Sequence, residues 1–281
     1  MGVLRSLALL AVVVQLAGCA SSRGTHGAEA ADQHPYWSYT EGDSGPSQWT
    51  VAGYPACGEF TQSPIVIRGA TFDASTRITF EYGTLPLRLF NDGHTVKALA
   101  RESGETNAIV VEQEVKGQVT KERYALAQFH VHAPGEHRFG DAGPYALELH
   151  LVHARKDEHG NESAVAVGVM IRAGQTSSEP DAYRTLFAQM PNNGNLVRNT
   201  GRTIDLRQIL PSLTPRFYHY VGSLTTPPCT LGVQWFVLPE PVALRPGTTV
   251  GYQNLFKVQT PPGNSRPAFE NTVVAVTKNF P

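Results

Sequence analysis

The segment QFHVHAPGEH, residues 128–137, places three histidines and a glutamate within ten residues. It closes the run YALAQFHVH (124–132), whose composition is typical of a β-strand. His130 and His132 are two residues apart, so on a strand their side chains leave the same face. Histidine gains little from burial in a core but gains from sharing a metal ion. The segment therefore predicts a strand that carries part of a metal site.

A second candidate strand, YALELHLVHAR (145–155), supplies a third histidine. His150 lies 18 residues after His132, a spacing that fits the facing strand of a hairpin. Three neutral imidazoles with one open position is the pattern of a catalytic zinc site, whereas a structural site is more often closed by a fourth Cys or His. The cysteines show no CxxC spacing. We therefore expect Zn²⁺ to be held by His130, His132 and His150.

Polar side chains that could orient these ligands recur at the same spacing. Gln128 precedes His130 by two residues, and Glu148 precedes His150 by two. A metal-bound histidine usually donates its other N–H to an acceptor, which fixes the ring. Gln128 and Glu148 are therefore predicted to be the acceptors behind the metal ligands.

The rest of the chain consists mostly of short apolar runs separated by Gly, Asn, Asp and Pro. Asn91-Asp92-Gly93 is a strong turn signal between two of these runs. A helix is expected over 181–190, ended by Pro191. This order predicts a mainly β fold: one domain, residues 35–281, around a large, mostly antiparallel, twisted central sheet with a few short peripheral helices. The other expected strands are 77–82, 87–90, 95–100, 108–112, 164–173 and 232–238.

Composition narrows the possible partners. The chain has 281 residues and a formal net charge of −1, with 17% charged residues and no basic stripe. Nucleic acid is therefore not an expected partner.

Residues 1–18 have the pattern of a secretory signal, with Arg5 before the apolar run 7–16. The run ends in Leu-Ala-Gly-Cys19, which resembles the lipobox of bacterial lipoproteins and implies acylation of Cys19. An ordinary cleaved signal with a chance cysteine is the alternative. The polar residues 19–34 are predicted to be a flexible tether. Ala at position 20, rather than Asp, favours a periplasmic protein anchored by lipid to the outer membrane, its only expected membrane contact.

If Cys19 carries lipid, Cys57 and Cys229 remain. Two cysteines in an exported domain favour a disulfide, and two unpaired buried thiols are the alternative.

The three-histidine pattern belongs to a larger set of motifs. Together, QFHVH, GEH and ELHLVH resemble the α-class carbonic anhydrases. The resemblance runs from about Trp37 to Arg266, which is nearly the whole expected domain. It implies the α-carbonic anhydrase fold and the reversible hydration of carbon dioxide to bicarbonate and a proton, by attack of a zinc-bound hydroxide. The further motifs that match the family are WSY (37–39), CGEFTQSPI (57–65), YVGSLTTPPC (220–229) and NSRP (264–267).

Carried over residue by residue, the resemblance assigns further catalytic roles. Thr225 is expected to accept the hydroxide's hydrogen bond and to donate its own to Glu136, and Thr226 to contact bicarbonate. Whether Ala166 or Val167 lines the pocket depends on the register and stays open. The apolar wall beside the substrate is expected to comprise Val152, Leu224, Val233 and Trp235.

The resemblance also implies a proton path. His94 matches the family's shuttle histidine, and Tyr39 a tyrosine that helps to order the connecting waters. Asp92 and Lys97 replace the asparagine and the neutral amide that are common nearby, and the sequence leaves the direction of their effect on His94 open. After NSRP the chain departs from the family pattern, and the sequence offers no physical explanation for Phe269.

Two other functional classes compete with this interpretation. The spacing His130-x-His132-x-x-x-Glu136 also resembles the metal motif of cupins, with Glu136 as a direct ligand, but the expected upstream glycine is replaced by Tyr124. Some carbonic-anhydrase-like domains are binding modules that have lost zinc ligands, whereas here the full set is present. The oligomeric state, monomer or homodimer, stays open.

Overall fold

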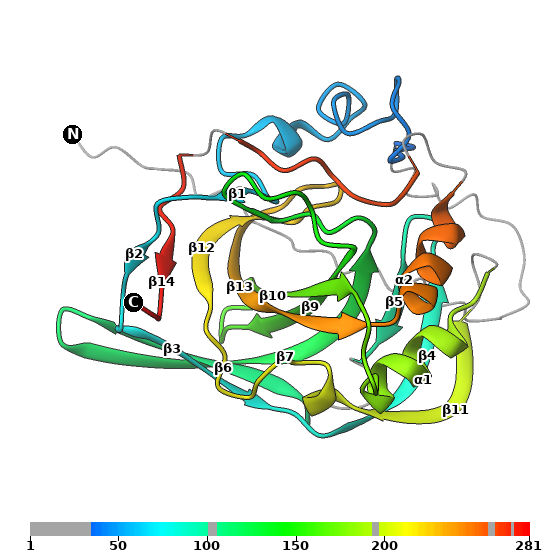
Figure 1. Ribbon diagram of the computed structural model, residues 1–281. Helices are drawn as coiled ribbons and strands as arrows, with labels where there is room; N and C mark the ends of the chain where they lie inside the picture. The colour runs from blue at the N-terminus through cyan, green and yellow to red at the C-terminus, as the bar shows by residue number, and fades with distance from the viewer. Residues whose placement is uncertain (1–34, 101–105, 193–196, 258–261, 271–272) are drawn as a thin grey trace, which may run out of the picture.

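A large twisted sheet forms the body of the protein in a computed structural model, which describes residues 35–100, 106–192, 197–257, 262–270 and 273–281 (Figure 1). The predictions for residues 1–18, for the tether 19–34 and for Cys19 lie outside the described residues. Within the described ranges, a 12-stranded sheet has the order β11-β4-β5-β7-β9-β10-β13-β12-β14-β2, with β6 pairing β7 and β3 pairing β6. The strands of this order are β11 (Val197–Asp205), β4 (Thr84–Asn91), β5 (Val96–Leu99), β7 (Gln118–His132), β9 (Leu147–Lys156), β10 (Glu162–Ala173), β13 (Leu231–Leu244), β12 (Tyr218–Ser223), β14 (Thr277–Lys278), β2 (Thr71–Phe72), β6 (Ala108–Val115) and β3 (Thr76–Glu81).

The mainly β fold class is confirmed. Most strand pairs are antiparallel, and the sheet is mixed because β10–β13 and β14–β2 are parallel. A separate parallel pair joins β1 (Val66–Ile67) to β8 (Arg138–Phe139). The helices of the described chain are short: α1 (Asp181–Gln189), α2 (Pro246–Gln253) and the 3-10 turns η1 (Pro55–Gly58), η3 (Leu206–Gln208) and η4 (Asn254–Phe256).

Strand ends differ from the sequence expectation where the chain leaves the core. β7 begins at Gln118 rather than at 124, because its exposed polar start forms a hairpin with β6. β11 is a largely exposed edge strand without apolar alternation, so its composition gave no strand signal. The expected helix 181–190 and the turn after Asn91 are both present, with Gly93 at φ +85°.

Along the central strands, apolar side chains on one face of the sheet alternate with polar side chains on the other. On β7, Phe129 and Val131 join the main hydrophobic core, whereas Gln128, His130 and His132 leave the opposite face. On β9, leucines alternate with Glu148 and His150 in the same way. The period of two therefore puts the core on one side of the sheet and the polar cluster on the other.

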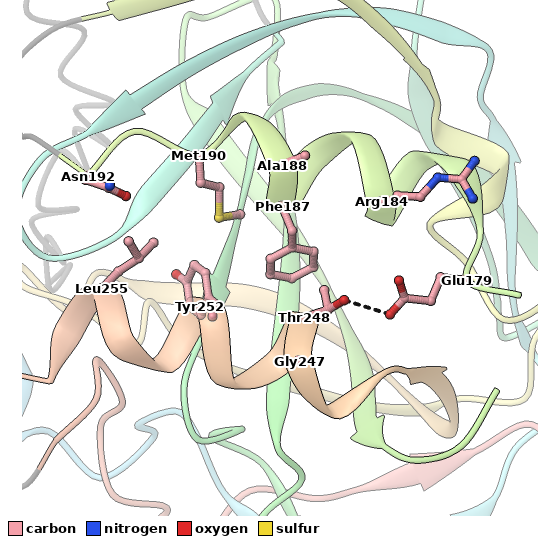
Figure 2. A pocket seen from close by; sticks show the side chains of 11 residues that line it. Glu179, Arg184, Phe187, Ala188, Met190, Asn192, Gly247, Thr248, Tyr252 and Leu255 are labelled. Atoms are coloured by element: carbon pink, nitrogen blue, oxygen red, sulfur yellow. Dashed lines mark hydrogen bonds between the residues drawn. The ribbon is translucent and has the colours of Figure 1, made fainter.

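Helices α1 and α2 cover the core side. Between them lies a cavity of about 390 Å³, lined in part by Phe187, Met190 and Leu255 (Figure 2). The hydroxyl of Tyr252, also in its lining, donates to the carbonyl of Val131, between the two histidines of β7. Tyr252 therefore connects α2 to the histidine strand, and the cavity that it lines is not the histidine site. None of the helices in the described ranges has the length and hydrophobicity needed to span a bilayer.

Candidate metal centre and active site

His130, His132 and His150 converge on one point. In the β7–β9 register His130 lies opposite His150, and His132 lies opposite Glu148. One ring nitrogen from each histidine lies within 4.8 Å of the others. The ring centroids are 4.8 Å apart for His130–His132 and 4.6 Å for His132–His150. The hairpin expected from the 18-residue spacing therefore brings the three imidazoles together.

Each histidine has one nitrogen engaged by the protein, which leaves the other for a ligand. His130 Nδ1 donates to Gln128 Oε1 at 2.9 Å. His132 Nδ1 donates to the backbone carbonyl of Asn264 at 2.7 Å. His150 Nε2 donates to Glu148 Oε1 at 2.8 Å. These bonds fix both the tautomer and the orientation of the rings.

The donor set fits zinc. Burial, and then the proximity of other histidines, holds the pKa of His130 well below its usual value. Burial also lowers the pKa of His150, and that of His132 to about 3. The imidazoles are therefore neutral, as metal binding requires. His132 Nε2 is buried and has no hydrogen-bond partner among the described residues, an unfavourable arrangement that a bound cation relieves.

Glu148 accepts from four N–H groups. Besides His150, its donors are His137 Nδ1 and the backbone nitrogens of Glu136 and His137, each at 2.7 Å. Burial alone would raise the pKa of Glu148, but His137 and His150 hold it well below its usual range. A buried carboxylate with this many donors stays ionised. Glu148 therefore places negative charge directly behind His150.

Glu136 is the second buried carboxylate, and its environment is different. Its Oε1 accepts the backbone N–H of Arg266 at 2.8 Å, and its Oε2 has no hydrogen-bond partner among the described residues. Burial raises the pKa of Glu136 well above its usual value, and interactions with Arg266 and the Thr225 hydroxyl partly oppose this shift. Oε2 lies 3.8 Å from His150 Nδ1. The arrangement brings Thr225, Glu136 and the histidine cluster together.

The buried side chain of Arg266 lies behind Glu136. Its guanidinium donates to Gln62 Oε1 at 2.7 Å and to the Cys57 carbonyl at 3.0 Å. The ring centroids of Trp49 and Phe269 lie 5.2 Å and 4.8 Å from its Cζ. Phe269, unexplained by the sequence, therefore provides an aromatic surface for this cation.

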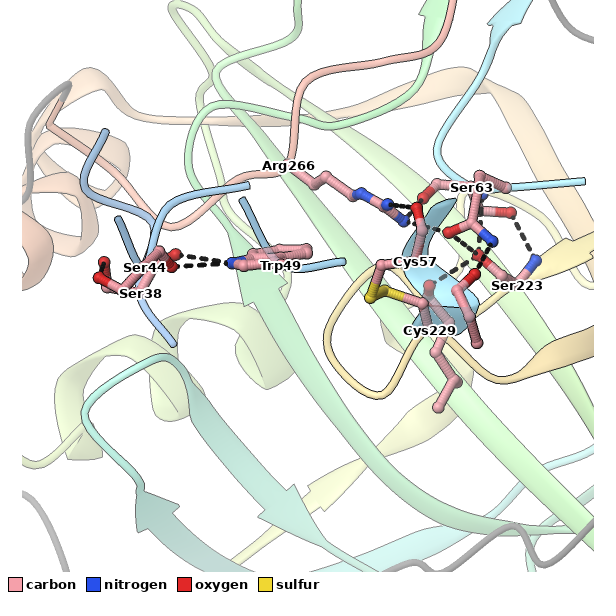
Figure 3. Close-up of a disulfide and its surroundings, with 11 residues drawn as sticks. Ser38, Ser44, Trp49, Cys57, Ser63, Ser223, Cys229 and Arg266 are labelled. Atoms are coloured by element: carbon pink, nitrogen blue, oxygen red, sulfur yellow. Dashed lines mark hydrogen bonds between the residues drawn. A yellow bond between two sulfur atoms is a disulfide. The ribbon is translucent and has the colours of Figure 1, made fainter. Parts of the chain in front are cut away.

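The loop between β12 and β13 carries Thr225 and Thr226, and a disulfide anchors it. Cys57 and Cys229 are bonded, as expected, and link the loop to η1 (Figure 3). The backbone N–H of Cys229 donates to the Thr226 carbonyl at 2.8 Å. Thr225 is buried, whereas Thr226 is half-buried. The loop therefore buries Thr225 and leaves Thr226 partly accessible to solvent.

Apolar residues form a wall beside the histidines. Trp235 packs against His150, with ring centroids 4.8 Å apart. Val233 and Leu224 belong to the same apolar cluster. Ala166 lies opposite both Val152 and Trp235 in the strand registers, whereas Val167 faces the main core. The register therefore puts Ala166, not Val167, on the wall.

His94 lies at the edge of the site. Its ring stacks on Trp37, with centroids 3.8 Å apart and planes 12° apart. The Tyr39 ring lies near both His94 and the histidine cluster: its centroid is 6.5 Å from that of the His94 ring and 6.5 Å from that of the His132 ring. The Tyr39 hydroxyl is buried without a hydrogen-bond partner in the described part of the chain. The Trp37 stack was not foreseen, because no local pattern connects residues this far apart in sequence.

Two other histidines, His137 and His153, are held by hydrogen bonds. His137 Nε2 lies 2.7 Å from the hydroxyl of Tyr220, which donates to Ser63. His153 Nε2 lies 2.7 Å from the hydroxyl of Tyr82, away from the cluster. The network of Tyr220 and Ser63 behind His137 was not predicted, because neither serine nor tyrosine has a distinctive spacing there.

Comparisons of the sequence and of the fold with known proteins find relatives of one family. Residues 44–270 match the family model described as eukaryotic-type carbonic anhydrase. A carbonic anhydrase of Klebsiella pneumoniae is 32% identical over 213 residues, covering 74% of this chain and 78% of that protein. One of Neisseria gonorrhoeae is 31% identical over 237 residues, covering 83% and 84%. The solved α-carbonic anhydrase of Thermovibrio ammonificans, in complex with the inhibitor sulfanilamide, is similar with a TM-score of 0.71 at 29% identity, covering 87% of this chain and 100% of that chain.

Proposed function

Because the chain belongs to the carbonic anhydrase family, lyases whose general reaction is the hydration of carbon dioxide, we propose that it hydrates carbon dioxide reversibly with zinc held by His130, His132 and His150. The convergence of these three neutral imidazoles carries the proposal. Membership of this family rules out the cupin alternative. The presence of all three histidines with Glu136 and Thr225 speaks against a binding module that has lost its ligands.

Zinc, when bound, supplies a Lewis acid that makes water a nucleophile near neutral pH. The chain's own contribution is to hold three neutral donors rigidly. Gln128, Glu148 and the Asn264 carbonyl each fix one ring by accepting its second N–H. Glu148 also adds negative charge behind His150, which makes that imidazole a stronger donor.

Thr225 and Glu136 orient the reacting oxygen in this proposal. Glu136 is anchored on one oxygen by Arg266 N–H, and its other oxygen is left for the Thr225 hydroxyl. A hydroxyl that donates to Glu136 can only accept from the reacting oxygen, so that oxygen's lone pair points towards the substrate carbon. Thr226, on the open side of the same loop, contacts the bicarbonate product.

Carbon dioxide has no net dipole, so an apolar wall is the suitable binding surface. Val152, Leu224, Val233 and Trp235 supply it, and the small side chain of Ala166, paired with Val152 and Trp235 in the sheet, leaves room beside them. The proton released in each turnover leaves through His94, with Tyr39 ordering the water between them. The position of Tyr39 between the His94 and His132 rings supports this path.

Cobalt substitution tests the metal assignment. Metal-free protein titrated with Co²⁺ is expected to bind one equivalent and to show the visible absorption of a tetrahedral site, changing when a sulfonamide is added. A His132→Gln variant that folds normally should lose this spectrum, and Lys121→Gln on the exposed hairpin should keep it. An octahedral spectrum, or binding unaffected by His132→Gln, would contradict the assignment.

We also propose that the enzyme is exported and lipid-anchored through Cys19, which lies outside the described residues. The Cys57–Cys229 disulfide supports an oxidising compartment. Expression of the full chain and of Cys19→Ser in a Gram-negative host, followed by membrane fractionation, tests this. The parent is expected in the outer-membrane fraction and the variant in the soluble periplasm; parent protein in the soluble fraction would exclude the anchor.

A further inference from the structure

The turn before β5 is built around one carboxylate. Asp92 Oδ1 accepts the backbone N–H groups of His94 at 2.9 Å and Thr95 at 2.8 Å. Its Oδ2 lies 2.6 Å from Lys97 Nζ. The carboxylate is 19% exposed and the Lys97 side chain 35%, so the pair is partly shielded from water. Asp92 therefore shapes the turn that presents His94 and at the same time forms an ion pair.

Lys97 extends on the face of the sheet that carries the metal centre. It lies opposite His130 in the β5–β7 register, and directly paired residues share a face. The Lys97 ammonium is thus held on the active-site side by the same carboxylate that holds the His94 backbone. A single ion pair connects the turn of the shuttle histidine to the strand beside the metal ligands.

The other groups around His94 are aromatic or neutral. Trp37 stacks on the ring, and the His94 carbonyl accepts from Asn264 Nδ2 at 3.1 Å. Among the residues that the structure describes, the titratable groups that face it are Asp92 from the turn, Lys97 from β5 and Tyr39 from the N-terminal segment. His94 Nδ1 is buried and has no hydrogen-bond partner in the described ranges. Asp92 and Lys97 are therefore the charges that set its local field.

We infer that the Asp92–Lys97 ion pair is the positioning element of the His94 proton relay. Asp92 fixes the turn that carries His94, and Lys97 neutralises the negative charge of Asp92. The inference rests on the proposed function, because it assigns a role within that relay. Neither residue touches the reacting atoms in this account, and both act through His94.

The compensation matters because His94 must be neutral to accept a proton. An unpaired carboxylate nearby stabilises the imidazolium and keeps the proton on the ring. Burial lowers the pKa of His94, Asp92 raises it and Lys97 lowers it. During hydration, kcat falls as the pH drops through the pKa of His94, because the protonated ring cannot accept another proton. The pair therefore lets the relay work at lower pH than an uncompensated Asp92 would allow.

The test separates proton transfer from carbon dioxide chemistry. In the zinc-loaded full chain, Lys97→Met should raise the midpoint of the kcat–pH profile by about one unit, which lowers kcat about tenfold below the midpoint. The midpoint of kcat/KM, which reports the metal centre, should move less. The His94 Cε1–H NMR titration should shift by the same amount as kcat. Asp92→Asn/Lys97→Gln removes both charges and should return both midpoints to near the parent values.

The matched control is Lys156→Met, which breaks a comparable cross-strand pair with Glu162, 2.9 Å apart at the far end of β9. It should leave both profiles unchanged. An unchanged His94 titration in Lys97→Met overturns the inference, and so does an equal shift in kcat and kcat/KM, because Lys97 then acts on the metal centre. A parent that shows no hydration contradicts the proposed function itself, and the NMR titration distinguishes that failure from failure of the ion-pair effect.

Discussion

Glu148 Oε1 is shared between His150 Nε2, at 2.8 Å, and His137 Nδ1, at 2.7 Å, with all three side chains buried. One carboxylate thus orients His150, a proposed metal ligand, and His137, a neighbouring histidine outside the proposed ligand set. Its second oxygen accepts two backbone N–H groups at the bend after β7. The ligand geometry and the local backbone therefore depend on the same side chain.

Replacing this carboxylate should weaken metal binding. Glu148→Gln keeps the size but offers a single acceptor oxygen and places an NH₂ group against N–H donors. Zinc affinity is expected to fall about 10–100-fold, as for other changes behind metal-bound histidines. Competition with a chromophoric chelator measures it. Glu112→Gln, on the half-exposed part of β6, is the control, and an unchanged affinity in Glu148→Gln would show that His150 is positioned without it.

His153 should make stability depend on pH. Burial lowers its pKa from an ordinary 6.5 to about 3. Between these values the unfolded chain binds a proton that the folded protein does not, so this contribution is complete above pH 6.5 and is lost as the pH falls. His153→Gln in metal-free protein should flatten the decline in unfolding free energy below pH 6.5, measured by urea denaturation. The exposed His159→Gln should leave the slope unchanged; a parental slope in His153→Gln would disprove the assignment.

The wall at Ala166 should control substrate size. Ala166→Val adds two methyl groups opposite Val152 and Trp235. The proposed site is also expected to hydrolyse activated esters. We expect Ala166→Val to slow the hydrolysis of bulky esters about tenfold more than the hydration of carbon dioxide, which is the scale of methyl-group discrimination in apolar pockets. Ala164→Val, one pleat away on the same face, controls for general packing strain. Equal losses on large and small substrates would show that Ala166 does not shape the pocket.

The disulfide should stabilise the whole fold. It closes a separation of 172 residues, for which the chain-entropy model gives about 5 kcal/mol. Cys57→Ser/Cys229→Ser should therefore unfold at much lower urea and should also lower kcat/KM, because the Thr225 loop loses its anchor. Reduction of the parent with a phosphine should reproduce both effects. A double variant that is destabilised but keeps its activity would show that the Thr225 loop does not need the disulfide for its active geometry.

The site was predictable from sequence where its geometry is local. Strand alternation places Gln128, His130 and His132 on one face of β7, and Glu148 and His150 on one face of β9. The 18-residue spacing between His132 and His150 then predicts that the two strands pair, which brings the three histidines together. Contacts across the chain were not predictable in this way. The His132–Asn264 bond joins residues 132 positions apart. The resemblance flagged Asn264 and Arg266 but gave neither the bond to His132 nor that to Glu136.

The fold, too, was predictable from local sequence patterns but not from pairing between distant segments. Strands with alternating or continuous apolar residues, such as β9 and β10, were found at nearly their observed bounds. β11 was missed because its residues are mostly polar and its strand conformation comes from pairing with β4. The Asp92–Lys97 pair could be suspected from two charged residues, but only the turn geometry shows that they neutralise one another.

Stopped-flow hydration of carbon dioxide by the zinc-loaded protein, beside a folded His132→Ala variant, determines whether the three-histidine cluster is a catalytic zinc centre. We expect fast hydration by the parent, inhibited by a sulfonamide, and none by the variant. A folded parent with one bound zinc and no hydration above the buffer rate would contradict this expectation.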